Sequence, residues 1–215
     1  MRQKNKRKLF AKLNLLFVGI GFILILGLII PALNYKLIDS NRHNYTELKN
    51  YFPLIEDQNI YNFMNQLIKN NPIDSLHYRK MRCFTISLDE DSKKVINKIS
   101  EKYLNKEDKK FILSQISNKR FLWDKNRLSN YWLLSQVVID SLHNEKEDFW
   151  KAFKKEYGFY GLHSFSKPLF NNNKDIVVIE HSGSGGGTLG SGSILIYKKV
   201  DNSWVLIENY RLWIS

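Results

Sequence analysis

Two histidines in the C-terminal part of the chain are the residues best suited to acid–base chemistry. His163 and His181 are each followed by a serine, and both lie near segments expected to form neighbouring strands, so their side chains can approach each other. A histidine beside a hydroxyl or thiol is the arrangement that activates a nucleophile. One hypothesis is therefore a hydrolase acting on peptide or glycan. One of these histidines would be its base, and Ser182 or Cys83 its nucleophile.

The same residues also have simpler structural interpretations. Cys83 alternates with polar positions in a strand-like run, residues 81–88, which is typical of a small buried apolar residue. The five histidines show neither the His-x-x-x-His nor the His-Glu-x-x-His spacing of zinc sites, and no Asp-x-Asp-x-Asp-Gly loop indicates calcium. We expect surface histidines, no metal and no cofactor.

A glycine-rich segment, residues 181–192, has the most unusual composition in the chain. Its glycines are Gly183, Gly185, Gly186, Gly187, Gly190 and Gly192. A phosphate-binding loop needs a helix directly after it, and a nucleophile elbow needs Gly-x-Ser-x-Gly followed by a helix. Neither fits, because a strand is expected from Ser193. We predict a flexible hairpin loop, with the alternative that it folds over a ligand or partner.

Hydrophobic spacing predicts helices mainly in the N-terminal half. Asp57 can cap a helix that ends near 70–72, and Asp89 and Asn105 can begin two more. A fourth helix is predicted from Glu145 to Tyr157, with Gly158 as its end.

Strands are predicted mainly in the C-terminal part. The expected segments are 81–88, 120–123, 131–139 (alternatively helical), 165–170, 175–180, 193–200 and 204–213, with a hairpin turn at 201–203. We therefore predict an α+β fold, in which a helix-rich N-terminal half packs on a C-terminal antiparallel β-meander.

Short motifs also follow one another in a characteristic order along residues 104–215. It runs from Phe-Ser-Lys-Pro-Leu-Phe (165–170) through the glycine-rich segment to Lys-Lys-Val-Asp-Asn-Ser-Trp (198–204) and a terminal Leu-Trp-Ile-Ser. This order resembles small, uncharacterised exported or membrane-anchored bacterial proteins that share such a C-terminal β module. The resemblance implies no activity and no catalytic residue. Several of those proteins carry cysteines in the glycine-rich loop, where this chain has glycine and serine.

The N-terminus predicts attachment to a membrane. Residues 13–33 contain no charge, and at about 1.5 Å per residue a helix of this length spans roughly the ~30 Å core of a bilayer. Residues 1–12 carry six basic residues and no acid, which favours a cytoplasmic N-terminus. The alternative is a cleaved signal, although the apolar run is long for one and no Ala-x-Ala site follows it. The predicted location is the cell membrane, crossed once, with the rest of the chain extracytoplasmic.

The charge balance excludes one class of partner. Of 33 basic residues, six precede the apolar run, which leaves 27 against 21 acidic residues. No basic stripe interleaved with aromatic residues suggests nucleic acid binding. A single cysteine excludes an intrachain disulfide, so the domain must be stabilised by its own core.

These observations predict a basic segment (1–12), an anchor (13–33), a juxtamembrane connector (34–56) and one extracytoplasmic domain (57–215). The favoured function is a non-catalytic, membrane-tethered module that binds an envelope protein or polymer through the glycine-rich loop and exposed aromatic residues such as Trp204, Tyr210 and Trp213. The alternative is the His-based envelope hydrolase. A third hypothesis is a purely structural role in an envelope assembly.

Overall fold

The computed structural model describes residues 45–69, 80–129, 131–143, 148–158, 161–186 and 189–215. The predicted basic segment and the predicted anchor, residues 1–33, lie outside these ranges. The transmembrane helix in the predicted fold class has no counterpart within them, because none of the described helices is long and apolar enough to cross a membrane.

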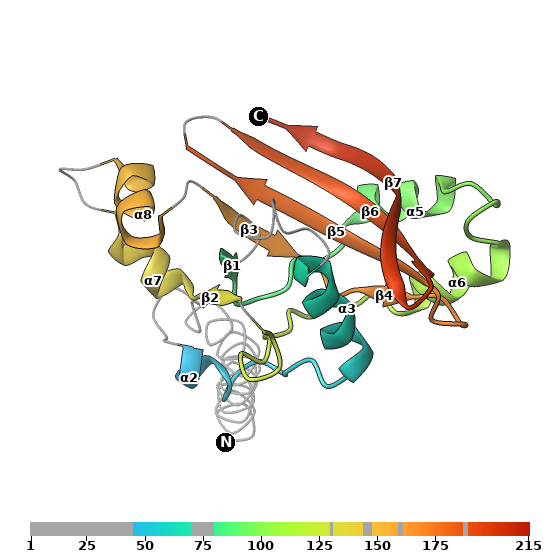
Figure 1. Ribbon diagram of the computed structural model, residues 1–215, viewed down its shortest axis with the longest axis horizontal. Helices are drawn as coiled ribbons and strands as arrows, with labels where there is room; N and C mark the ends of the chain where they lie inside the picture. Colours follow the sequence, from blue (N-terminus) through green and yellow to red (C-terminus); the bar gives the residue numbers. More distant parts are fainter. Residues whose placement is uncertain (1–44, 70–79, 130, 144–147, 159–160, 187–188) are drawn as a thin grey trace, which may run out of the picture. The chain divides into compact units, whose positions relative to one another are not determined.

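A seven-stranded mixed sheet forms the centre of the described part (Figure 1). Its strands are β1 (Lys80–Arg82), β2 (Trp132–Leu134), β3 (Leu162–Phe165), β4 (Leu169–Phe170), β5 (Ile176–Ser184), β6 (Gly190–Val200) and β7 (Ser203–Ile214). The order is β2-β1-β3-β5-β6-β7, with β4 also pairing with β5. β1 pairs in parallel with β2 and β3, whereas the other pairs are antiparallel.

The predicted α+β fold, a helical half packed on an antiparallel meander, is therefore wrong. The antiparallel part of the sheet is extended by β1 and β2, which precede β3 in the chain and run parallel to it. Strands were predicted at 81–88 and 131–139, but the strands found there have only three residues each. Parallel strands are also joined by long connections, so their pairing leaves no local signal.

The described helices begin and end at the residues best suited to those positions. They are α2 (Tyr45–Leu48), α3 (Gln58–Lys69), α5 (Glu90–Lys98), α6 (Lys106–Ser114), α7 (Gln136–Ser141) and α8 (Phe149–Tyr157). Asp89 and Asn105 cap α5 and α6 as predicted, each accepting a backbone N–H with its side chain. Gly158 ends α8 with φ +82°, a conformation that glycine adopts without strain.

Two predicted elements changed character. The run 131–139 contains a strand and a helix, β2 and α7, separated by Ser135, whose hydroxyl caps α7 by accepting from Val138 N. The fourth predicted helix begins later than Glu145, at Phe149, where Asp148 accepts from Lys151 N.

In the predicted connector, Leu48 and Ile55 are buried, so its described part packs into the domain.

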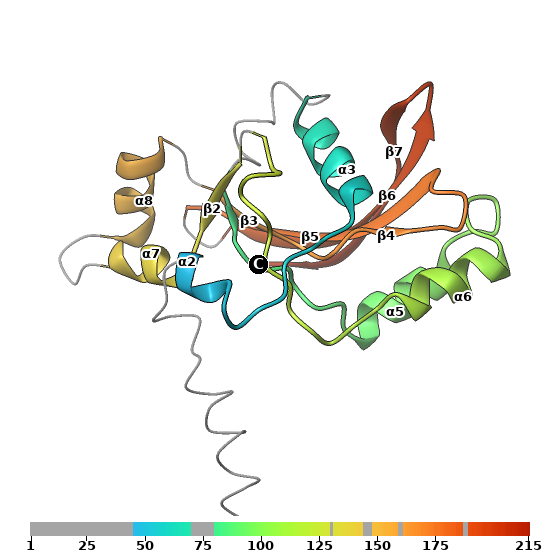
Figure 2. The ribbon, with the colours of Figure 1, turned by 90° about the horizontal axis from the view of Figure 1, so that it is seen from below.

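Helices cover both faces of the sheet, as Figure 2 shows, with α3 on one side and α5 and α6 on the other. Alternate residues of β5 divide between the two cores. Val177 and Ile179 pack in the cluster that includes α3, and Ile176 and Val178 pack in the cluster that includes α5 and α6. A strand buried on both faces appears as a continuous apolar run, which explains why residues 176–179 showed no alternation.

Phe63 attaches α3 to the sheet. Its side chain is fully buried, with ring centroids 5.3 Å from Tyr197, 5.4 Å from Trp204 and 6.4 Å from Phe170. We expect Phe63→Ala to lower the free energy of unfolding by about 3–5 kcal/mol, because it removes a large core ring and leaves a cavity. Urea unfolding measures this. The exposed neighbour Asn62→Ala should change stability by less than about 0.5 kcal/mol, and equal effects would contradict this arrangement.

Candidate functional site

Most of the predicted site residues gather at one end of the sheet, where β5 leads into β6. β5 continues to Ser184 and β6 begins at Gly190, and the two strands pair over this whole stretch. The predicted twelve-residue loop is thus a five-residue connection, 185–189. Gly185 and Gly186 lie in this connection, and Gly187 lies outside the described residues. Gly183, Gly190 and Gly192 are strand residues.

His163 and His181 meet across β3 and β5, as their positions in the sequence allowed. The register pairs His163 with Gly183 and Phe165 with His181, so the imidazoles are diagonal neighbours. His163 Nδ1 lies 2.8 Å from His181 Nε2, a hydrogen bond in which one ring donates and the other accepts. The rings are stacked with centroids 5.1 Å apart, and Phe165 stacks on His181 at 4.8 Å.

Burial determines the charge of His181. It lowers the pKa of His181 to about 4, so His181 is neutral near pH 7. Two nitrogens bound to one zinc ion at about 2.0 Å in tetrahedral geometry would lie about 3.3 Å apart, farther than the distance found here. Among the described residues, no group of three or more His, Cys, Asp or Glu side chains is placed to hold a metal ion.

The absence of a side chain at Gly183 leaves room for the His163 ring. A Cβ at this position would lie 3.1 Å from His163 Nδ1 and 3.2 Å from Cε1, closer than side chains normally approach. The glycine is therefore explained by a close contact between neighbouring strands.

The predicted nucleophiles do not complete a catalytic site around the histidines. Ser182 is flanked by His181 and Gly183 in β5, so its side chain points to the opposite face of the sheet. Cys83 is 1% exposed in an apolar cluster with Leu48 and Leu122. Burial raises its pKa to about 12, which leaves a neutral thiol.

On the opposite face, Trp213 lies over two glycines of β6. A Cβ at Gly192 would lie 2.1 Å from Trp213 Nε1, and one at Gly190 would lie 3.2 Å from Cζ3. The register places Ser182 beside Gly192 and Ser184 beside Gly190, so both serines share this face. Trp213 remains 43% exposed. We call these five residues the Trp213 surface.

The other predicted aromatic contacts are less accessible. Trp204 is partly buried against Phe63 and Phe170, on the α3 side of the sheet. Tyr210 is partly buried in the core cluster that includes α5 and α6. Trp132, at the β2 end of the sheet, is 51% exposed, and sequence reasoning did not single it out.

A carboxyl group that sequence reasoning missed lies next to the histidine pair in sequence. Glu180 Oε2 is 2.7 Å from Ser92 Oγ, which is also 2.9 Å from Asp89 Oδ1 at the start of α5. A hydroxyl has one hydrogen, so it can donate to only one of these carboxyl groups. Burial raises the pKa of Glu180, with Asp89 adding to the effect, whereas hydrogen bonds lower the pKa of Asp89. Of the two carboxyl groups, Glu180 is therefore the one whose protonated form the fold favours more.

The raised pKa of Glu180 predicts how the stability of the protein depends on pH. A carboxyl group whose pKa is raised by folding stabilises the protein while it is protonated, and this contribution is lost as the pH rises through its folded pKa. Glu180→Gln retains a side-chain oxygen that can accept from Ser92 Oγ, without the charge. We expect this variant to be more stable than the wild type at pH 8 and the difference to shrink toward pH 4. Urea unfolding at several pH values tests it, with the exposed Glu156→Gln as control.

The contact between Gly192 and Trp213 makes a second prediction. Gly192→Ala should lower the free energy of unfolding by about 1–3 kcal/mol, because the new methyl group displaces the indole. The loss should be much smaller in a Trp213→Ala background, where nothing opposes the methyl group. An equal loss in both backgrounds would mean that the indole is not the obstacle. Ser191→Ala, at an exposed neighbouring position, serves as the control.

Comparison with known proteins supplies no relative from which a role could be transferred. Searches against protein-family models, curated proteins and solved structures find no match to this chain. The resemblance of residues 104–215 to exported bacterial proteins stays a prediction. The function must be inferred from the geometry of the Trp213 surface and the histidine pair.

Proposed function

We propose that this protein is a membrane-tethered, non-catalytic binding module of the cell envelope, with its ligand contacted at the Trp213 surface. The sequence supports the location: an uncharged run at 13–33 follows a basic segment without acids, which favours a cytoplasmic N-terminus and an extracytoplasmic domain. The role in binding is supported by the end of the sheet where β5 and β6 meet.

The observation that carries the proposal is the setting of Trp213. Large aromatic rings normally bury most of their area, and a partly exposed indole at a fixed position is typical of recognition surfaces. Here the ring is positioned by Gly190 and Gly192, which leave room for it on the sheet. Leu189, the residue before Gly190, is 71% exposed, whereas Ile214 pairs with Ser191 and its side chain is on the opposite face of the sheet.

The chemistry of this surface favours a glycan polymer as ligand. The apolar C–H faces of sugar rings can pack on an indole, and their hydroxyls can bond to serine side chains at its border. Ser182 and Ser184 are on the same face as the ring, two strands away. Such a surface needs no deep pocket, since it contacts one face of an extended polymer.

The His-based hydrolase is less well supported. The histidines form a pair, but the nucleophiles proposed with them are a serine on the opposite face and a buried neutral thiol. General-base catalysis requires the base and the nucleophile within hydrogen-bond distance or one water apart.

Binding to a cell-wall polymer tests the proposal. We expect Trp213→Ala to weaken cosedimentation of the full chain with purified peptidoglycan about tenfold, the equivalent of ~1.4 kcal/mol of lost ring contact. Trp132→Ala removes a tryptophan of similar exposure from the other end of the sheet, and it should bind like the wild type. Unchanged sedimentation of the Trp213 variant, or an equal loss in both variants, would contradict the Trp213 surface as the binding site.

A further inference from the structure

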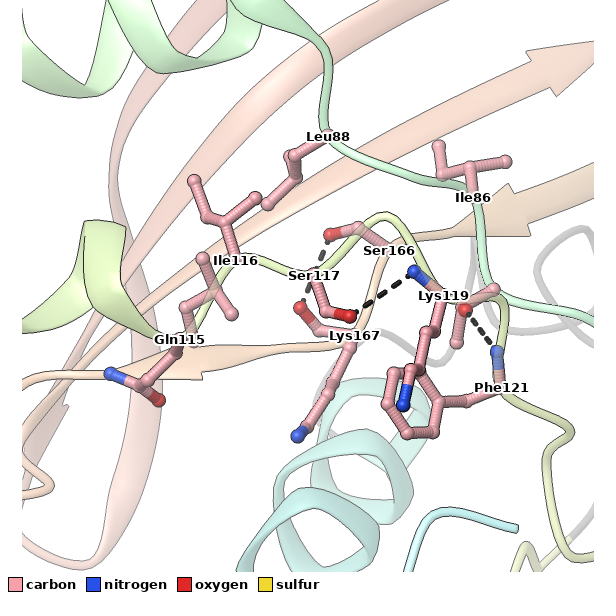
Figure 3. A pocket seen from close by; sticks show the side chains of 11 residues that line it. Ile86, Leu88, Gln115, Ile116, Ser117, Lys119, Phe121, Ser166 and Lys167 are labelled. Atoms are coloured by element: carbon pink, nitrogen blue, oxygen red, sulfur yellow. Dashed lines mark hydrogen bonds between the residues drawn. The ribbon is translucent and has the colours of Figure 1, made fainter. Parts of the chain in front are cut away.

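A small pocket lies away from the Trp213 surface, between three connecting segments (Figure 3). The segment after β1, the segment after α6, the turn between β3 and β4 and the first residue of β4 supply its lining. The lining residues are Thr85, Ile86, Leu88, Gln115, Ile116, Ser117, Lys119, Phe121, Ser166, Lys167 and Leu169. Its volume of about 20 Å³ has room for roughly one water-sized group, far too little for a whole metabolite.

The rim of this pocket is positively charged. Lys119 and Lys167 line it, and its lining contains no aspartate or glutamate. Figure 3 shows the two side chains extending toward the same side of the pocket. Lys167 Nζ lies 5.0 Å from the centre of the Phe121 ring, a cation–π contact that holds the ammonium at the pocket.

A hydroxyl donor accompanies the two ammonium groups. Ser117 Oγ accepts a hydrogen bond from Lys119 N at 3.1 Å, which leaves its own hydrogen to donate. Two lysine ammoniums and one hydroxyl are donors suited to an anion with several oxygens. The pocket therefore offers the donors of an oxyanion site.

The walls of the pocket are tied to the rest of the domain. Thr85 N donates to Phe121 O at 2.9 Å, and Phe121 N donates to Thr85 Oγ1 at 3.0 Å. Gln115 Nε2 donates to Phe170 O at 2.7 Å, and Ser166 Oγ accepts from Glu180 N at 2.9 Å. A site with such walls is formed before a ligand arrives, so binding does not need to order them.

The end of α6 points toward this region, and the negative end of a helix dipole disfavours an anion. Its last carbonyls are engaged, however. Phe111 O accepts from Ser114 Oγ, Ile112 O from Gln115 N and Leu113 O from Ile116 N. The two full positive charges of the lysines outweigh the partial charge of a nine-residue helix whose carbonyls are occupied.

We propose that this pocket binds a phosphate group, held between Lys119 and Lys167 with Ser117 as a third donor. The group lies at the mouth, because the cavity beneath it accommodates only a substituent the size of a methyl group. The phosphate belongs either to a small soluble phosphate compound or to the headgroup of an anionic phospholipid. This inference goes beyond the proposed function, and its site shares no residue with the Trp213 surface.

The first test titrates the full chain, in neutral detergent micelles, with inorganic phosphate and with glycerol phosphate. Binding is followed by NMR shifts of the backbone amides of residues 115–121 and 166–169, excluding Pro168. We expect saturable shifts, and an affinity at least tenfold weaker in the Lys119→Gln/Lys167→Gln variant, since two charge-assisted contacts are lost. The control variant Lys151→Gln/Lys155→Gln removes the same charge from exposed positions of α8 and should bind like the wild type.

Three outcomes would overturn the proposal. The first is that acetate or chloride at equal ionic strength produces the same shifts as phosphate. The second is that both double variants lose affinity equally, which would indicate general screening of charge. The third is that the pocket variant binds phosphate as tightly as the wild type. Thermal unfolding of each variant confirms that it is folded.

A second arm identifies the source of the phosphate. Vesicles of phosphatidylglycerol in phosphatidylcholine are compared with vesicles of phosphatidylcholine alone. Binding to the anionic vesicles that requires both lysines, and that glycerol phosphate displaces, supports a lipid headgroup. Binding of the soluble compounds without lysine-dependent vesicle binding supports a free phosphate ligand. Trp213→Ala should leave both measurements unchanged, so the failure of one proposal does not affect the other.

Discussion

The antiparallel pairing of β5 with β6 is the constraint on which the rest of the described structure depends. Nine residue pairs join the two strands without a shift of register. Because side chains alternate between the faces of a strand, this register decides what each face presents. It directs Val177 and Ile179 toward α3, and Ile176 and Val178 toward α5 and α6. A slip of β5 by one residue would exchange the residues that face the two cores.

Where β5 ends and β6 begins, the two faces of the sheet carry different functional groups. One face holds two imidazoles hydrogen-bonded to each other, with His181 kept neutral by burial. The other face holds the hydroxyls and the exposed indole of the Trp213 surface. A hydroxyl and a base that lie on opposite faces of one strand cannot exchange a proton directly. This separation is the physical reason why we propose recognition and not hydrolysis at this site.

The edge of the sheet at β7 is shaped to limit unwanted pairing. β7 is twelve residues long, and Val205, Leu206 and Ile214 are exposed on it, which makes it a template for another strand. Two irregularities interrupt its pairing with β6, near Gly192 and near Ile196. Such bulges increase the twist and break a long edge into short regular segments. The bulges disfavour the addition of another strand to this edge. A ligand can still contact side chains of β7 such as Trp213.

Local sequence determined the features of this protein that depend on neighbouring residues. The caps at Asp89, Asn105 and Gly158 were predictable because each acts on backbone groups within three or four residues. The tight turn between β6 and β7, with positive φ at Asp201 and Asn202, follows from the same local preferences. Composition alone also predicts a membrane anchor at 13–33. Only the tertiary structure decided the parallel pairing of β1, the meeting of Glu180 with Ser92 and the purpose of the glycines. Gly183 and Gly192 indicated flexibility in sequence, whereas each leaves room for a ring about twenty residues away. A glycine shows that a side chain is absent, and only the fold shows what occupies that space.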